Sequence, residues 1–133
     1  MKVVTSKFNK EELEHILNSN PKMGNLEDLS MYNESNYFQI KQMIKENKLI
    51  GYAVIFLGYN GLESNDISIE DIAYWGKDIE YVENMSILLE EIKNSHYPFP
   101  VDNIYYDDEK YYGLGLTFER LGYITKGQTR WMA

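Results

Sequence analysis

One nearly unbroken apolar run, LIGYAVIFLGY at residues 49–59, constrains the fold of this chain more than any other feature. It is far shorter than the about 20 residues that a membrane-spanning helix needs. Its β-branched and aromatic residues favour a strand instead. Because polar residues do not alternate with apolar ones along the run, we expect a central strand that is covered on both faces of the sheet.

The residues around this run predict the rest of the sheet. Residues 37–44 form a second β-rich run, and the polar KENK at residues 45–48 joins the two runs as an antiparallel hairpin. Further strands are predicted at residues 67–75, at residues 103–108 and from residue 123 to the end. Most neighbouring strands are therefore expected to be antiparallel.

Capping signals and apolar spacing predict three helices. Asn9 and Glu12 have the spacing of a capping box, which begins a helix over residues 10–19. A second helix, over residues 81–93, is predicted to pack on the sheet. Gly122 is suited to end a third helix. The second helix is expected to bury Met85, Leu88, Leu89 and Ile92, and the third to present Leu114, Phe118 and Leu121 on one face.

The order of these elements indicates the fold class. Residues 22–36 carry mixed signals and are predicted to be irregular with one helical turn. No repeat or linker divides the 133 residues, so we expect one domain over residues 1–133. The whole is an α/β domain of the α+β type, with a mixed, mostly antiparallel central sheet flanked by helices.

The charge and the rare residue types exclude several function classes. The chain has 21 acidic and 13 basic residues, a formal net charge of −8, and this repels nucleic acid and favours a cationic partner. An acidic surface is also what ordinary solubility requires. With no cysteine and two histidines, redox and zinc sites are not expected, and no metal is predicted. We expect a cytoplasmic protein that does not associate with membranes.

Two stretches resemble the GNAT acetyltransferase superfamily. FERLGYITKGQTRWMA, residues 118–133, is similar to its carboxy-terminal signature of an aromatic residue, a charged pair, Leu-Gly-aromatic and a strand with Met near its end. GYAVI followed by ISIEDIAYW is similar to its third and fourth strands. The resemblance extends from about residue 37 to the end and weakly includes the first helix. It implies a GNAT-like domain in which acetyl-CoA lies between the fourth and fifth strands.

The resemblance implies coenzyme contacts through the main chain. In the family, backbone groups of the fourth strand bind the pantetheine amides as a neighbouring strand would. The corresponding residues here are Ile72 and Tyr74. Both are also ordinary strand residues, and the sequence does not separate the two interpretations.

The family's phosphate-binding loop has no match in this sequence. Glu80, Glu83 and Met85 stand where the family has Arg or Gln and two small residues, so acetyl-CoA is expected to bind weakly. Acidic residues in a first helical turn are also what an unliganded helix prefers, because they complement its dipole. A shifted alignment instead places Gly76 and Lys77 at the pyrophosphate.

The resemblance also implies positions for the acid and the base of acetyl transfer. Phe118 stands where many members have a tyrosine acid, and phenylalanine cannot donate a proton. Glu70 and Asp71 lie on the fourth strand, where some members place a glutamate base. Adjacent strand residues face opposite sides, so we expect at most one of them in the cleft, with Glu70 preferred and Asp71 its competitor.

Two functions remain open at this point. The first is an N-acetyltransferase that moves an acetyl group from acetyl-CoA to a primary amine of a cationic small molecule or peptide. The second is a degenerate GNAT-fold domain without coenzyme that serves as an interaction or dimerisation module, for example as a homodimer. Aromatic residues suited to such an interface are Tyr105, Tyr106, Tyr111, Tyr112 and Trp131.

Overall fold

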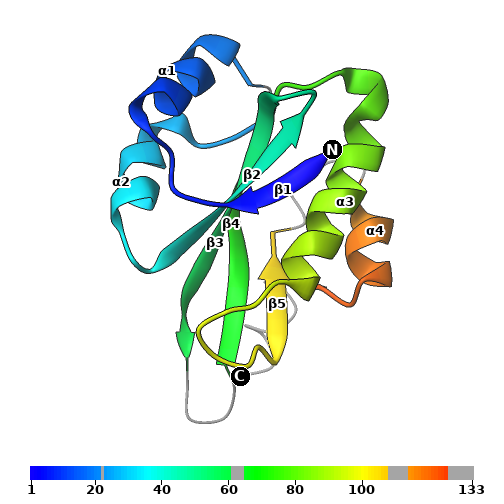
Figure 1. The fold of residues 1–133 in the computed structure, drawn as a ribbon. Helices are drawn as coiled ribbons and strands as arrows, with labels where there is room; N and C mark the ends of the chain where they lie inside the picture. Colours follow the sequence, from blue (N-terminus) through cyan, green and yellow to red (C-terminus); the bar gives the residue numbers. More distant parts are fainter. Residues whose placement is uncertain (22, 61–64, 108–113, 126–133) are drawn as a thin grey trace.

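The structure, a computed structural model, describes residues 1–21, 23–60, 65–107 and 114–125 (Figure 1). The strands are β1 (Lys2–Thr5), β2 (Phe38–Lys45), β3 (Lys48–Asn60), β4 (Asn65–Tyr74), β5 (Asn103–Tyr106) and β6 (Ile124–Thr125). The helices are α1 (Lys10–Ser19), α2 (Leu29–Glu34), α3 (Tyr81–Asn94) and α4 (Gly115–Arg120), with short 3-10 turns η1 (Leu26–Asp28) and η2 (Asp78–Glu80). Three of the predicted interface aromatics, Tyr111, Tyr112 and Trp131, and the predicted strand end at residues 126–133 lie outside the described residues.

The strands form one six-stranded sheet in the order β1-β2-β3-β4-β5-β6. The first four strands pair antiparallel, and β5 pairs parallel to both β4 and β6. This confirms the predicted fold class, a mixed and mostly antiparallel sheet with helices. The first strand was not predicted, because KVVT is only four residues long and is held by pairing with β2.

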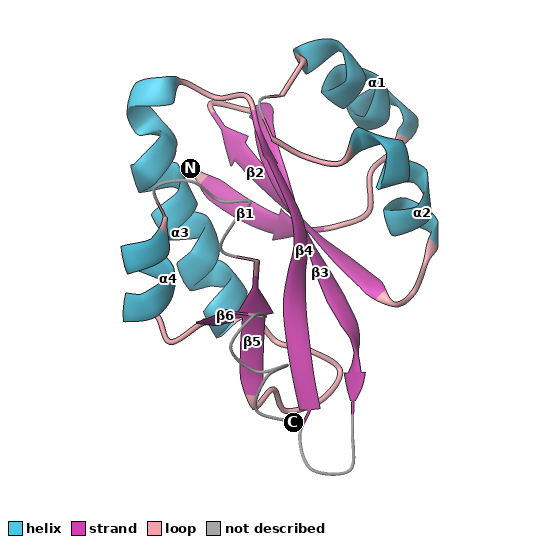
Figure 2. Ribbon diagram, turned by 180° about the vertical axis from the view of Figure 1, so that it is seen from behind, coloured by secondary structure: helices cyan, strands magenta, loops and turns pink. Residues whose placement is uncertain are grey.

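Helices cover both faces of the sheet, as Figures 1 and 2 show from opposite sides. The α1 and α2 side and the α3 and α4 side each have a hydrophobic cluster, and β3 contributes to both clusters. The prediction of a central strand covered on both faces is therefore confirmed. So is the predicted burial of the α3 stripe, because Met85, Leu88, Leu89 and Ile92 are each 0% exposed.

The predicted start of α1 is confirmed in atomic detail. The Glu12 backbone N–H donates to Asn9 Oδ1 at 2.8 Å, and the Asn9 N–H donates to Glu12 Oε1 at 2.9 Å. This reciprocal pair satisfies two of the N–H groups that a helix start leaves unpaired. Asn9 and Glu12 are three residues apart, so their spacing in the sequence was sufficient to predict where the helix begins.

Residues 22–36 contain more helix than the sequence predicted, because η1 is followed by the six-residue α2. A distant lysine holds the end of α2. The Lys7 ammonium donates to the backbone carbonyls of Tyr32 at 3.0 Å, Ser35 at 2.8 Å and Phe38 at 2.7 Å. Since these carbonyls lie at and beyond the helix end, Lys7 supplies the hydrogen bonds that the helix itself cannot make.

Candidate active site at the open edge of β4

β5 runs beside only the first part of β4 (Figure 1). The register pairs Asp66–Ser68 with Asn103–Tyr105, and within the described residues no later part of β4 pairs with β5. The described pairing of the two parallel strands therefore ends at Ser68. The far half of β4, from Ile69 to Tyr74, has no described strand beside it on the side away from β3, and this stretch is the open edge of β4.

The backbone groups of Ile72 and Tyr74 point toward this open edge, away from β3. The Trp75 N–H donates to the Ile50 carbonyl at 2.8 Å, which marks a hydrogen-bonded pair in the antiparallel ladder. Such pairs alternate with pairs whose N–H and C=O groups point away from each other. In the same register Ile72 lies opposite Ala53 and Tyr74 lies opposite Gly51, so Ile72 and Tyr74 direct their backbone groups away from β3.

The side chain of Tyr74 explains the next residues of the chain. Its hydroxyl donates to the Lys77 carbonyl at 2.7 Å and accepts from Asn84 Nδ2 at 3.1 Å. A Cβ on Gly76 would lie 2.6 Å from the Tyr74 hydroxyl oxygen, so only glycine fits there. Packing on Tyr74 thus accounts for Gly76, while the Lys77 side chain is exposed near the start of α3. A coenzyme role for Gly76 and Lys77 stays a prediction.

We expected Glu70 and Asp71 to face opposite sides of the sheet. This expectation was wrong, because β4 contains a bulge at Glu70. Val54 lies opposite Asp71 and Ile55 lies opposite Ile69, so Glu70 is the extra residue in this register. An extra residue of this kind interrupts the alternation of side chains. Glu70 and Asp71 therefore both turn toward the α1 and α2 side, where their negative charges act on Tyr32 of α2.

Asp71 is a buried structural acceptor. It is 4% exposed, and its Oδ2 accepts from the Asn25 backbone N–H at 2.9 Å and from the Tyr52 hydroxyl at 3.1 Å. Gly24, with φ of 116°, lies so close to β4 that an added Cβ would be 2.6 Å from Ala73 Cβ. Asp71 thus anchors the segment before α2 to the sheet.

Glu70 is the more accessible of the two carboxylates. It is half-buried, and its Oε1 accepts from the Ser68 hydroxyl at 2.7 Å. Tyr32 lies nearby on α2, and burial is the largest cause that raises the pKa of its phenol to about 12. The charges of Asp71, Asp28 and Glu70 add to this rise. The phenol is therefore protonated at neutral pH and can donate a hydrogen bond into this acidic cluster.

An ion pair occupies the start of α3, where the family resemblance implies a phosphate site. Lys45, at the end of β2, donates to Glu80 Oε2 at 2.6 Å. This hydrogen bond is the main reason that the pKa of the Glu80 carboxyl is below its usual value, and the charges of Lys77 and the N-terminal amine act in the same direction. The sequence analysis missed Lys45, because 35 residues separate it from Glu80.

Met85 does not obstruct this site as expected, because its side chain is fully buried in the core under α3. Glu83 is exposed in the first turn of α3 and keeps its acidic side chain at the site. The start of α3 therefore still differs from a phosphate-binding loop in two ways. It carries negative charge, and it lacks the small residues that let a phosphate approach the backbone.

Phe118 is a core residue. It is 0% exposed, and its ring stacks on Tyr106 with centroids 3.8 Å apart and an interplanar angle of 3°. The ring of Tyr123 meets it edge-on at 5.2 Å. Phe118 thus joins α4 to β5 and β6, and it fills space rather than facing an opening.

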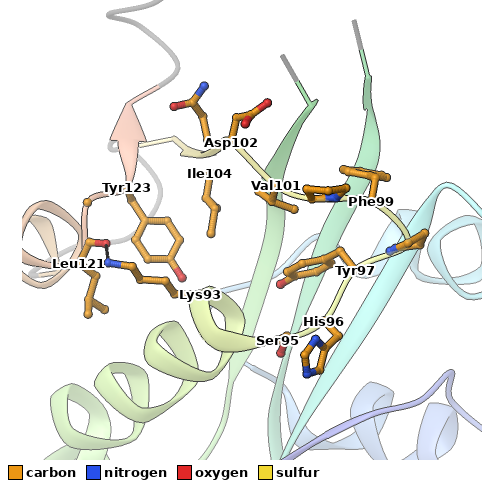
Figure 3. A pocket seen from close by; sticks show the side chains of 14 residues that line it. Lys93, Ser95, His96, Tyr97, Phe99, Val101, Asp102, Ile104, Leu121 and Tyr123 are labelled. Carbon is orange, nitrogen blue, oxygen red and sulfur yellow. Dashed lines mark hydrogen bonds between the residues drawn. The ribbon is translucent and has the colours of Figure 1, made fainter.

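A separate pocket lies at the other end of α3, with a volume of about 600 Å³ (Figure 3). Its walls come from the end of α3, from residues 95–104 and from the turn at residues 121–123. The sequence analysis placed nothing here, because the wall is built from three segments that meet only in the fold. The available signal was the pair of aromatic residues Tyr97 and Phe99, each followed by a proline.

Searches of the described residues for other kinds of site found neither a metal-binding cluster nor a helix with the length and apolar character of a membrane span. No family model matches the sequence, and no curated protein matches it. The crystal structure of a GNAT family acetyltransferase from Staphylococcus aureus subsp. aureus USA300_TCH1516 is similar, with 18% identity and a TM-score of 0.48, over 77% of this chain and 95% of that chain.

Proposed function

We propose that this chain is a GNAT-like N-acetyltransferase that moves an acetyl group from acetyl-CoA to a primary amine of a cationic small molecule or peptide. The observation that best supports this proposal is the open edge of β4. There, Ile72 and Tyr74 direct backbone donors and acceptors away from β3, beyond the point where β5 stops pairing. An extended chain of amides, such as pantetheine, matches such groups as an added strand does.

Glu70 is the proposed base for the incoming amine. The ammonium of the acceptor has to lose a proton before its nitrogen attacks the thioester carbonyl, and the proton passes to Glu70 directly or through a water. The C–N bond forms as the C–S bond breaks, and the nitrogen releases its second proton to solvent. The thiolate takes a proton from solvent, because Phe118 cannot supply one. The acidic residues around Tyr32 and the net charge of −8 favour a cationic acceptor.

The start of α3 fits the coenzyme less well than β4 does. Glu80 and Glu83 place negative charge where a pyrophosphate would lie. Lys45, Lys77 and the N-terminal amine are cations near it, and Lys45 already pairs with Glu80. We therefore propose that acetyl-CoA binds weakly and that its phosphates compete with Glu80 for Lys45.

A domain without coenzyme that acts as an interaction or dimerisation module is the second candidate. The observation that favours it is the Lys45–Glu80 pair, since the charge that a phosphate needs is already neutralised within the chain. Phe118, stacked on Tyr106 in the core, is consistent with a site that has lost its acid.

Titration of the labelled protein with acetyl-CoA, followed by backbone amide NMR, separates the two candidates. The acetyltransferase predicts shifts at residues 69–83 and acetylation of polyamines or lysine peptides. Shifts without any acetyl transfer would show that the protein binds the coenzyme but does not transfer the acetyl group. An absence of shifts at millimolar acetyl-CoA would refute the proposal and favour the interaction module. Analytical sedimentation would then measure whether the protein self-associates.

A further inference from the structure

The pocket at the end of α3 is separate from the proposed active site. α3 has 14 residues, and its first turn lies at the open edge of β4 while its last turn borders the pocket. At about 1.5 Å per residue, the two ends are about 20 Å apart. The volume of about 600 Å³ is in the range of small-molecule sites.

Three hydroxyl groups in the wall of the pocket already have hydrogen-bond partners on α3. The Tyr97 hydroxyl donates to the Ile92 carbonyl at 2.6 Å, and the Ser95 hydroxyl donates to the Glu91 carbonyl at 2.6 Å. The Tyr123 hydroxyl donates to the Leu89 carbonyl. These three carbonyls belong to the last turns of α3, so the hydroxyls also cover the negative end of the helix dipole.

Two lysines place positive charge at the pocket, Lys93 in its wall and Lys41 behind it, and one residue of the wall, Asp102, is acidic. Lys93 lies in the wall and donates to the Leu121 carbonyl, as Figure 3 shows. Lys41 lies behind the wall at 2% exposure, donating to Ser95 Oγ at 2.9 Å with its ammonium 5.4 Å from the Tyr97 ring centroid. Within the described part of the chain, neither lysine forms an ion pair with a carboxylate.

The buried lysine shows that this charge is costly. Burial lowers the pKa of the Lys41 ammonium, and the more distant charge of Glu91 opposes this effect only in part. A buried cation without an adjacent carboxylate is unfavourable, and an anion placed nearby would offset the cost.

Asp102, the acidic residue of the wall, is hydrogen-bonded to the start of β4. Its Oδ2 accepts from the Asn65 backbone N–H at 2.8 Å, and its own N–H donates to the Asn65 carbonyl at 2.8 Å. It holds the start of β4 and lies at the end of the pocket away from Ser95 and His96 (Figure 3). His96, on the same side as Ser95, adds a further donor to the rim.

We infer that this pocket binds a small amphipathic carboxylate, with an apolar or aromatic body among Tyr97, Val101, Leu121 and Tyr123 and its carboxylate toward Lys93 and the wall in front of Lys41. The anion supplies the counter-charge that both lysines lack. An uncharged ligand of the same shape would gain only the apolar contacts, and a cationic one would meet like charge.

Matched probes test this inference by amide NMR titration: phenylbutyrate, phenylbutanol and phenylbutylamine share one body and differ in charge. Phenylbutyrate is expected to bind most tightly and to shift residues 93–104 and 121–123. Lys93→Met should lower the affinity for phenylbutyrate by about tenfold, because a charge-assisted hydrogen bond is lost. The affinity for phenylbutanol should not change. Lys41→Met should also weaken phenylbutyrate, and the exposed Lys10→Met on α1 should change neither probe.

Several results would overturn the inference. Phenylbutylamine binding as tightly as phenylbutyrate would show that the charge of the pocket does not select anions. Shifts confined to residues 69–83, or no shifts at millimolar phenylbutyrate, would show that the pocket is not the site. If Lys41→Met does not fold, the surface variant Lys93→Met still decides, because unchanged phenylbutyrate binding would contradict the role of Lys93.

Discussion

Lys45 and Glu80 form an ion pair at 2.6 Å that ties the β2–β3 hairpin to the start of α3. The two side chains are 26% and 28% exposed, so solvent screens the pair and its effect on folding is small. The position of the pair matters more, because Glu80 is bound to Lys45, a cation that a coenzyme phosphate would need.

Glu80→Gln should therefore strengthen acetyl-CoA binding. The variant removes one negative charge and frees Lys45, so we expect a severalfold higher affinity in titration calorimetry with little change in melting temperature. Glu90→Gln, an exposed change on the same helix, is the control and should have no effect. Weaker binding of acetyl-CoA to Glu80→Gln would mean that Glu80 contributes to the site instead of blocking it.

Glu70 and Asp71 should separate chemistry from stability. Glu70→Gln is expected to lower acetyl transfer by at least about tenfold, as loss of a general base does, without changing stability. Asp71→Asn should cost about 1–3 kcal/mol of unfolding free energy, because it disturbs a buried acceptor with two donors. Turnover under saturating acetyl-CoA and urea denaturation measure the two effects. A stable Asp71→Asn variant with lost turnover would assign the base to Asp71.

Leu88 tests the packing of α3 on the sheet. The side chain is 0% exposed, so Leu88→Ala should lower the unfolding free energy by about 2–5 kcal/mol in urea. Leu116→Ala on α4 is the control, because Leu116 is 74% exposed and little burial is lost. A loss below about 0.5 kcal/mol for Leu88→Ala would be incompatible with a buried large-to-small substitution.

Lys41 should make the stability depend on pH. Its pKa in the folded protein is lowered from the ordinary value of 10.5, so between the two values the unfolded chain binds more protons and stability rises with pH. Lys41→Met removes this contribution. Urea denaturation across the alkaline range should therefore show a steeper rise for the original chain than for Lys41→Met. Parallel curves would mean that Lys41 titrates alike in both states.

The sequence predicted what local patterns determine. The capping box at Asn9 and Glu12 and the apolar stripe of α3 involve residues within a few turns of one another, and both were found as expected. The end of α2 depends on Lys7, more than 20 residues away, so its extent was missed.

The candidate site was predicted less completely for the same reason. The backbone groups of Ile72 and Tyr74 point away from β3, and their role in binding the coenzyme stays a prediction. The bulge at Glu70 involves no glycine or proline, so strict alternation gave the wrong side for one carboxylate. Lys45 reaches Glu80 only through the fold, and a linear pattern cannot pair them.

The bulge has a consequence for how β4 can change. Ile69 and Asp71 already face consecutive residues of β3, so a chain lacking Glu70 would keep the same strand pairing on both sides of the deletion. Ile72 and Tyr74 would still point into the α3 side, and Ala73 into the other. The pairing of β4 with β3 therefore does not depend on the extra residue, and Glu70 adds a carboxylate that accepts from the buried Ser68 hydroxyl. The bulge thus adds one acidic side chain to the α1 and α2 face without changing the strand pairing around it.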